Sequence, residues 1–301
     1  MIDTIDRFDG THVKMWGGIT YSLLTFAKLA PPQTRIQPVC KVGKKVAPIW
    51  MELLQQFPTM DLRGVQRTGR NHHNVLRYKT PEERQESFQP GDHTLTFQDL
   101  EPFLEAHAFY INVLFPEDLS LETLRTFSFG TTGWLYLDIH SWVRVLDPVS
   151  RTFVPRPFPH PWQQVIALVD LVQMNQEELG ALIGMEIQTP EQEKALVKWM
   201  LQLGPKVVLV THGSGPVTMG VREGTSVRIV EAQPDAVPAK DPTGCGDVFG
   251  AAFFMEWIRT ENADLALEKA MKIARLHALR EWIPEAWLTF PEKRADETNS
   301  S

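Results

Sequence analysis

Short apolar segments alternate with amphipathic helical segments along this chain, and this alternation constrains its fold more than any other feature. The apolar segments have the length of buried strands, and we expect central strands at 109–115, 134–138, 165–174 and 206–211. Segments with the helical spacing of apolar residues separate most of them, at 120–127, 176–182 and 190–203. Strands and helices in alternation predict an α/β fold.

The N-terminal part of the chain adds a second pattern. An amphipathic helix is expected at 19–30, and a strand at 36–42 and a helix at 46–57 follow it. Between residues 62 and 79, polar and apolar residues alternate over short distances. This alternation predicts a hairpin that stands away from the core.

Composition limits the classes of partner. With 301 residues the chain can bury a substantial core, and its net charge of −7 argues against a general nucleic-acid surface. Cys40 and Cys245 lie far apart in sequence, which suggests neither a disulfide framework nor a cysteine zinc site. Asp3, Asp6 and Asp9 make the N-terminus the reverse of a signal peptide, and no apolar run has the length of a membrane span. We therefore expect a cytoplasmic protein without a membrane or nucleic-acid partner.

The segment Asp241-Pro-Thr-Gly-Cys-Gly-Asp247 carries the clearest chemistry. Its two glycines free backbone N–H groups for an anion, at the start of an apolar helix whose positive dipole end faces the same point. Asp247 would repel a phosphate in the ground state, so its position fits a base that takes a proton from a hydroxyl attacking phosphorus. An ordinary helix start with Asp in the first turn explains the segment equally well. The chain contains no P-loop sequence, and Pro242 argues against the strand that a dinucleotide fingerprint needs.

This segment resembles the D-T-x-G-A-G-D signature of the ribokinase (PfkB) family of sugar and nucleoside kinases, with Cys245 in place of the usual alanine. The resemblance implies that Asp247 is the catalytic base and that Gly244, Cys245 and Gly246 form an anion hole. It also implies a doubly wound, mostly parallel sheet with helices on both faces and a small β lid.

The resemblance gives a plan for the whole chain, 1–301, as a single kinase domain. The lid hairpin is expected at about 62–83, with further lid residues at about 6–16. Because exposed strand edges tend to be covered, we expect a homodimer that pairs through the lid.

Asn175-Gln-Glu-Glu178 follows an apolar segment and resembles the N-x-x-E motif of the same family. The resemblance implies that Glu178 organises the water shell of Mg²⁺, a hard cation that keeps several waters, and that Asn175 holds a nearby phosphate or water. Asn as a helix cap with Glu three residues later is also an ordinary helix start, related to the capping box.

Nucleotide contacts are expected along the segment that begins at Thr211. Thr211, Gly213 and Gly215 resemble the T-x-G-x-x-G segment that lies along ATP in these kinases, although a hairpin turn explains the glycines equally well. By family analogy a helix at 263–281 closes the adenine side, with His277 on its lining. A histidine among apolar neighbours is also typical of a packed core.

The acceptor side is expected near the N-terminus. Gly17 and Gly18 resemble the family's glycine pair that opens a helix, and Asp3 is the expected anchor for substrate hydroxyls, with Asp6 as its rival. The family's first strand precedes this Asp, whereas only two residues precede Asp3, so the strand is shortened or the start lies upstream.

Together these features predict an ATP- and Mg²⁺-dependent kinase that phosphorylates a hydroxyl of a small sugar, polyol or nucleoside, with Asp247 as the base. A nucleotide- or sugar-binding regulator without turnover is the alternative, although binding alone needs no base. A serine hydrolase at Ser214 is a third hypothesis, but the G-x-S-x-G elbow is absent from the sequence.

Overall fold

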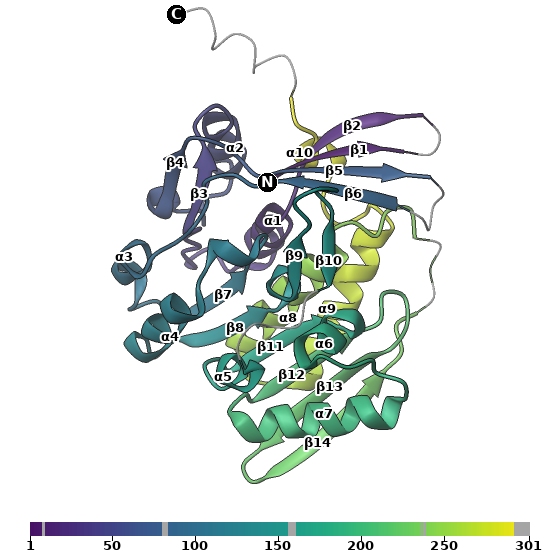
Figure 1. Ribbon diagram of the computed structural model, residues 1–301. Coiled ribbons are helices and arrows are strands. Elements are labelled where there is room, and N and C mark those ends of the chain that lie inside the picture. Colours follow the sequence, from purple (N-terminus) through teal and green to yellow (C-terminus); the bar gives the residue numbers. More distant parts are fainter. Residues whose placement is uncertain (8–9, 80–83, 156–160, 236, 238, 292–301) are drawn as a thin grey trace, which may run out of the picture.

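The computed structural model describes residues 1–7, 10–79, 84–155, 161–235, 237 and 239–291, and it is built around a six-stranded sheet (Figure 1). The strand order is β14-β13-β12-β11-β8-β7. The strands, in chain order, are β7 (Ala108–Asn112), β8 (Trp134–Asp138), β11 (Leu171–Asn175), β12 (Val207–Thr211), β13 (Val217–Glu223) and β14 (Ser226–Ala232). Strands β7, β8, β11 and β12 run parallel, and β13 and β14 are added antiparallel.

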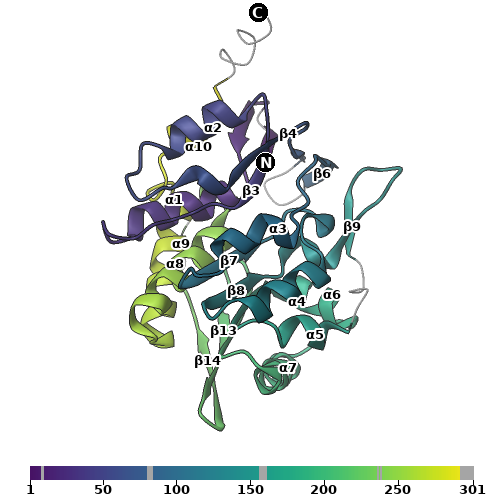
Figure 2. The same cartoon turned by 90° about the vertical axis from the view of Figure 1, so that its left-hand side faces the viewer.

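Helices cover both faces of this sheet, as a doubly wound fold requires. Alternate side chains of β12 show the two faces: Val207 and Leu209 belong to one buried cluster, and Val208 and Val210 belong to the other. On the first face lie α1 (Ile19–Leu29), α8 (Cys245–Thr260) and α9 (Ala263–Ala278). On the second face lie α4 (Leu121–Gly130), α5 (Trp162–Ile166), α6 (Gln176–Ile183) and α7 (Pro190–Leu203), and Figure 2 shows the two layers on opposite sides of the sheet.

The expected strand at 165–174 is wrong in its first half. Residues 165 and 166 end α5, and β11 begins only at Leu171. Asp170 interrupts the apolar run just before β11. Its Oδ2 accepts a hydrogen bond from the N–H of Leu135 at 2.9 Å. A short apolar run cannot by itself distinguish a buried strand from a buried helix.

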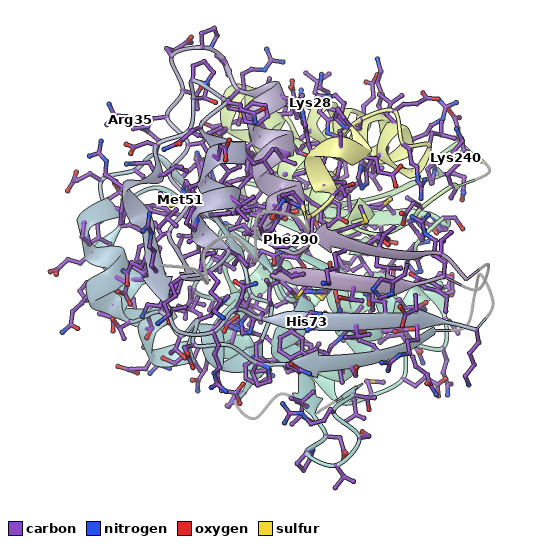
Figure 3. All side chains as sticks on the ribbon, turned by 90° about the horizontal axis from the view of Figure 1, so that it is seen from above. Lys28, Arg35, Met51, His73, Lys240 and Phe290 are labelled. Atoms are coloured by element: carbon purple, nitrogen blue, oxygen red, sulfur yellow. The ribbon has the colours of Figure 1, made fainter. Side chains whose placement is uncertain are left out.

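A separate four-stranded sheet forms the lid, in the order β2-β1-β5-β6. Its strands are β1 (Ile2–Asp6), β2 (His12–Trp16), β5 (His73–Tyr78) and β6 (Arg84–Gln89). Figure 3 looks down on these strands, and His73 marks β5. The hairpin expected at about 62–83 therefore lies at 73–89, and residues 80–83 are outside the described part of the chain.

The beginning of that expected hairpin belongs to another sheet. Strand β4 (Val65–Thr68) pairs in parallel with β3 (Cys40–Gly43), and not with the lid. A cavity of about 730 Å³, lined mostly by apolar side chains, separates β3 from the edge strand β7. Alternating polarity correctly indicated a strand at 65–68, but the strand with which it pairs depends on residues distant in sequence.

The remaining elements are short. They are α2 (Ala47–Leu54), α3 (Phe97–Leu100), α10 (Glu285–Leu288), the hairpin β9 (Arg144–Leu146) and β10 (Phe153–Pro155), and four 3-10 helices, η1 (Leu62–Gly64), η2 (Glu101–Phe103), η3 (Pro116–Asp118) and η4 (His140–Val143). Among the described residues, none of the helices combines the length and apolar character needed to cross a bilayer.

Candidate active site

A cavity of about 310 Å³ lies between the lid and the carboxyl ends of the parallel strands. The strand register places Asp138 beside Gln173, and Asn175 beside Thr211, at this edge of the sheet. Ligands bind at this edge in open α/β sheets. Most of the residues that the sequence motifs indicated line the cavity: Asp3, Gly18, Asn175, Glu178, Thr211, Gly244, Gly246 and Asp247.

The first turn of α8 forms one wall of the cavity, and its two glycines serve different purposes. Gly244 has φ +78°, and a Cβ there would lie 2.6 Å from the ring of Tyr21, so both backbone and packing require glycine. A Cβ on Gly246 would meet only Gln173 Nε2, at 3.8 Å. Gly246 therefore leaves its side of the helix start open to the cavity, where backbone N–H groups and the helix dipole favour an anion.

A residue of β11 holds this helix start in position. Gln173 Nε2 donates a hydrogen bond to the carbonyl oxygen of Gly246 at 3.1 Å. Cys245 points elsewhere, because its Sγ lies 3.9 Å from the carbonyl oxygen of Ala274 and its side chain does not line the cavity. The thiol of Cys245 therefore takes no part in the cavity wall.

Asp247 lies in the same turn of α8, partly buried in the cavity wall. Asn112, at the end of β7, donates a hydrogen bond through Nδ2 to Asp247 Oδ1 at 2.8 Å. Burial raises the pKa of Asp247 to about 6, although the charge of His140 and the bond from Asn112 oppose the increase. A carboxyl group with a pKa near neutrality can take up and release a proton at physiological pH.

Three further titratable groups, Asp138, His140 and Glu178, line the same cavity as Asp247. Asp138 and Glu178 are both buried, and His140 Nδ1 lies 3.4 Å from Glu178 Oε1. Burial and then the charge of Glu178 raise the pKa of Asp138 well above its usual range. Burial alone would lower the pKa of His140, but the hydrogen bond and charge of Glu178 outweigh it and raise that pKa to about 9.

Sequence reasoning missed Asn112 and His140. Each is a polar residue at or just beyond the carboxyl end of a parallel strand, which was the only available signal. His140 also has φ +31°, a backbone conformation that is uncommon for a residue other than glycine and that recurs at functional sites.

The glycine pair at 17–18 holds Asp3 at the lid side of the cavity. A Cβ on Gly17 would lie 1.9 Å from Asp3 Oδ2, so this carboxylate can occupy its position only beside glycine. Gly18 has φ +60° and packs against Leu114. The rival anchor Asp6 pairs instead with His12 and Arg77, and it does not line the cavity.

The sequence model of the pfkB family of carbohydrate kinases matches residues 62–281, most of this chain. This chain belongs to the pfkB family. The pyridoxal kinase PdxY of Leifsonia xyli subsp. xyli is 35% identical over 141 residues, which are 43% of this chain and 49% of the relative. The ribokinase of Arabidopsis thaliana is 30% identical over 146 residues, 44% of this chain and 36% of the relative, so the chain aligns with half or less of each curated relative.

Solved structures of the family have the same fold over nearly the whole chain. A pyrophosphate-dependent kinase of the ribokinase family, in a sulfate complex, superposes with a TM-score of 0.75 at 20% identity and covers 99% of this chain and 96% of that one. The Arabidopsis thaliana ribokinase complexed with ribose and ATP gives a TM-score of 0.72 at 18% identity, with 100% and 96% covered. The expected ribokinase-like fold is confirmed.

The N-x-x-E motif of this pfkB-family chain both caps a helix and lines the cavity, so the two interpretations of its sequence are compatible. Asn175 Oδ1 accepts a hydrogen bond from the N–H of Glu178 and Glu178 Oε2 accepts one from the N–H of Asn175, each at 2.8 Å, so a reciprocal cap forms. Both side chains also line the cavity. The capping box therefore holds Glu178 in place at the cavity wall.

The cavity fits a hydrated Mg²⁺ ion and lacks the features of a site built from protein ligands alone. Across the described residues, no group of three or more His, Cys, Asp or Glu side chains has the arrangement of a metal cage. Glu178, Asp138 and Asp247 nevertheless supply carboxylate oxygens around one cavity, and their repulsion contributes to the raised pKa of Asp138. Mg²⁺ binds through one or two carboxylates and keeps several waters, which matches this donor set.

Of Thr211, Gly213, Gly215 and His277, which were expected to contact the nucleotide, Thr211 lines the cavity and the other three do not. Gly213 and Gly215 lie in the turn between β12 and β13, and the carbonyl oxygen of His212 accepts a hydrogen bond from the N–H of Gly215. His277 is buried behind the loop before α8, where Nε2 lies 2.9 Å from the carbonyl oxygen of Thr243. His277 therefore supports this loop from behind, as the packing interpretation predicted.

Proposed function

We propose that this chain transfers the γ-phosphoryl group of ATP to a hydroxyl of a small sugar, polyol or nucleoside. The observation that supports this proposal best is the position of Asp247. Its carboxyl group, with a pKa raised to about 6, lies in the glycine cradle at the start of α8 and faces the same cavity as Asp3 of the lid. One cavity therefore brings together the residues that we propose as the base, the anion site and the anchor for hydroxyl groups.

In the proposed reaction the substrate hydroxyl lies against Asp247, with Asp3 holding other hydroxyl groups. Asn112 occupies Asp247 Oδ1, so the other carboxylate oxygen accepts the proton of the attacking hydroxyl. The amides at Gly244–Gly246 hold the oxygens of the transferring phosphoryl group, where charge is spread over three equatorial atoms.

Residues on the strand side would hold the donor. Glu178 would position the water shell of Mg²⁺, which neutralises phosphate charge when bound, and Asn175 and Thr211 line the wall beside it. Protonated His140 lies among Glu178, Asp138 and Asp247, where its positive charge offsets part of their repulsion. The same positive charge favours phosphate oxygens at this wall.

A regulator that binds without turnover is the alternative on the same fold. Binding needs no base. In this cavity a carboxyl group lies beside the proposed anion site, and its negative charge weakens the binding of a phosphate there, which a protein that only binds would have no reason to keep. We therefore favour the kinase.

The test is a screen of acceptors with Mg²⁺, in which release of ADP or phosphate is followed. The panel contains sugars, polyols, nucleosides and pyridoxal, and pyrophosphate is a second donor because a similar structure is a pyrophosphate-dependent kinase. At least one acceptor should stimulate donor consumption, and the Asp247→Asn protein should show no stimulation. Acceptor binding by calorimetry with no turnover on any donor would instead support the regulator.

A further inference from the structure

We propose that Asn74 is a specificity-determining residue of the acceptor site and that it acts with Asp3 to select neighbouring hydroxyl groups of a neutral sugar or cyclic polyol. This inference rests on the proposed kinase function and names the class of its acceptor. Sequence reasoning indicated no role for Asn74.

The amide of Asn74 has one end satisfied and one end open. Asn74 is 5% exposed and lines the cavity from lid strand β5. Its Nδ2 donates a hydrogen bond to Glu86 Oε1 at 3.0 Å, whereas its buried Oδ1 has no hydrogen-bond partner among the described residues. A buried carbonyl oxygen without a partner is unfavourable, so a donor from a ligand would satisfy it.

Glu86 fixes which end of the amide is open. A carboxylate only accepts hydrogen bonds, so the amide must turn its NH₂ group toward Glu86 and its oxygen away from it. Arg144 Nη1 lies 3.9 Å from Glu86 Oε2 and holds the other side of this carboxylate. Glu86 is therefore a positioning residue, and Asn74 Oδ1 is the group offered to a hydroxyl.

Strand register places this acceptor beside the carboxylate of Asp3. Asp3 and Asn74 are direct partners in the parallel pair β1–β5, and both line the cavity. Neighbouring strands lie about 4.8 Å apart, a distance that two side chains can close toward hydroxyls on adjacent carbon atoms. Two acceptors side by side match a diol, since each hydroxyl has one proton to donate.

The surroundings of the pair favour a neutral ring. Leu76 and Phe88, both buried, line the cavity from the same lid strands and offer an apolar wall for the C–H face of a ring. The carboxylates of Asp3 and Glu86 disfavour an anionic group at this end. The whole cavity has a volume of about 310 Å³, at the lower end of the range for small-molecule sites, and it must also hold the transferring phosphoryl group, so the part beside the lid has room for no more than one ring with its hydroxyls.

The experiment combines two variants with deoxy analogues of the best acceptor from the screen. Asn74→Leu removes the acceptor at similar volume, and Asn74→Ala is a second variant; Gln85→Ala, an exposed position of β6, is the matched control. The Asn74 variants should lose kcat/KM for the acceptor on the order of 10- to 100-fold, the effect of one buried hydrogen bond, with an unchanged KM for ATP. For the wild type, two deoxy analogues that lack adjacent hydroxyls should show similar losses.

The decisive result is non-additivity. For the analogue that lacks the hydroxyl facing Asn74, the Asn74→Leu change should cause no further loss, because the interaction is already gone. Equal losses on the complete and the deoxy acceptors would overturn the inference, as would wild-type preference for pyridoxal, which has no vicinal diol. Two measurements separate the two proposals: calorimetric binding of the polyol to the Asp247→Asn protein, with and without Asn74→Leu, and turnover of the same polyol by the wild type. Binding that depends on Asn74, together with no turnover by the wild type on any donor, supports the inference and contradicts the kinase. Binding that ignores Asn74, together with wild-type turnover, contradicts the inference alone.

Discussion

Replacing Asp247 by Asn tests the proposed base while changing the structure little. The amide keeps the size of the side chain, and its oxygen can still accept the hydrogen bond that Asn112 Nδ2 donates at 2.8 Å. The variant loses the ability to take up a proton and, at neutral pH, the negative charge of the carboxylate. Because a positioned general base contributes about 10²- to 10⁴-fold, we expect kcat to fall by that factor with little change in the KM of the acceptor.

The same substitution should stabilise the fold, and the pH dependence has a defined sign. Raising the pKa of Asp247 from 3.8 to about 6 means that the folded protein binds this proton more tightly than the unfolded chain. The ionised group is therefore destabilising at neutral pH, by at most about 3 kcal/mol for such an increase, and the cost disappears as pH falls below 4. Asp247→Asn should raise Tm by several degrees at pH 8 and by much less at pH 4.

The loss of kcat is measured by the release of ADP or phosphate, and the gain in Tm is measured by calorimetry at pH 4 and pH 8. Asp264→Asn is the matched control, since Asp264 also lies in the first turn of a helix but is exposed and pairs with Arg228. The ordinary helix-start interpretation predicts an active, equally stable Asp247→Asn protein, because Asn and Asp cap helices equally well. A folded variant that retains more than about a tenth of wild-type kcat would refute the base, given the expected range.

Three further predictions concern the walls and edges of the cavity. His140→Ala should move the acidic limb of the kcat/KM profile to higher pH, because the imidazolium charge opposes the increase in the pKa of Asp247; an unmoved limb would show that the two groups are not coupled. Gly246→Ala should keep the Tm of the wild type but lower kcat, since the new Cβ would lie 3.8 Å from Gln173 and face the cavity. Gly244→Ala should lower Tm, because the new Cβ would lie 2.6 Å from the ring of Tyr21. Equal losses of Tm in the two variants would contradict these different roles of the two glycines. The lid should pair two copies through the outer parts of β2 and β6, and a monomer mass by light scattering at micromolar concentrations would exclude such a dimer.

The parts of the site that the sequence could predict are those set by local spacing. Gly244, Gly246 and Asp247 lie in one helical turn, so their common wall follows from the order of residues at a helix start. Asn175 and Glu178 are likewise three residues apart at the start of α6. Such motifs keep their geometry wherever the helix packs, which is why they could be recognised without a structure.

The parts that could not be predicted depend on which strands pair. Asn112 reaches Asp247 across 135 positions of sequence, and Asn74 reaches Asp3 only through the register of β1 and β5. The polar and apolar alternation of a strand indicates which side chains share a face, but a shift of one residue would turn Asn74 away from the cavity. The misplaced hairpin has the same cause, because β4 satisfies its alternation with β3 as well as it could with β5.

The cavity is divided between two sheets, and the proposed function assigns the reaction to one and the choice of acceptor to the other. Asp247, its anion cradle and the strand-end carboxylates belong to the core, where α8 and the parallel strands fix them. Asp3 and Asn74 belong to the lid, whose described strands form a sheet of their own, separate from the core sheet. A substitution on the inner face of the lid can therefore change which hydroxyl compound fits while the base and the anion cradle stay in place. If the proposed acceptor site is correct, we expect the acceptor of this chain to depend on strand register in the lid, which is the feature that its sequence reveals least.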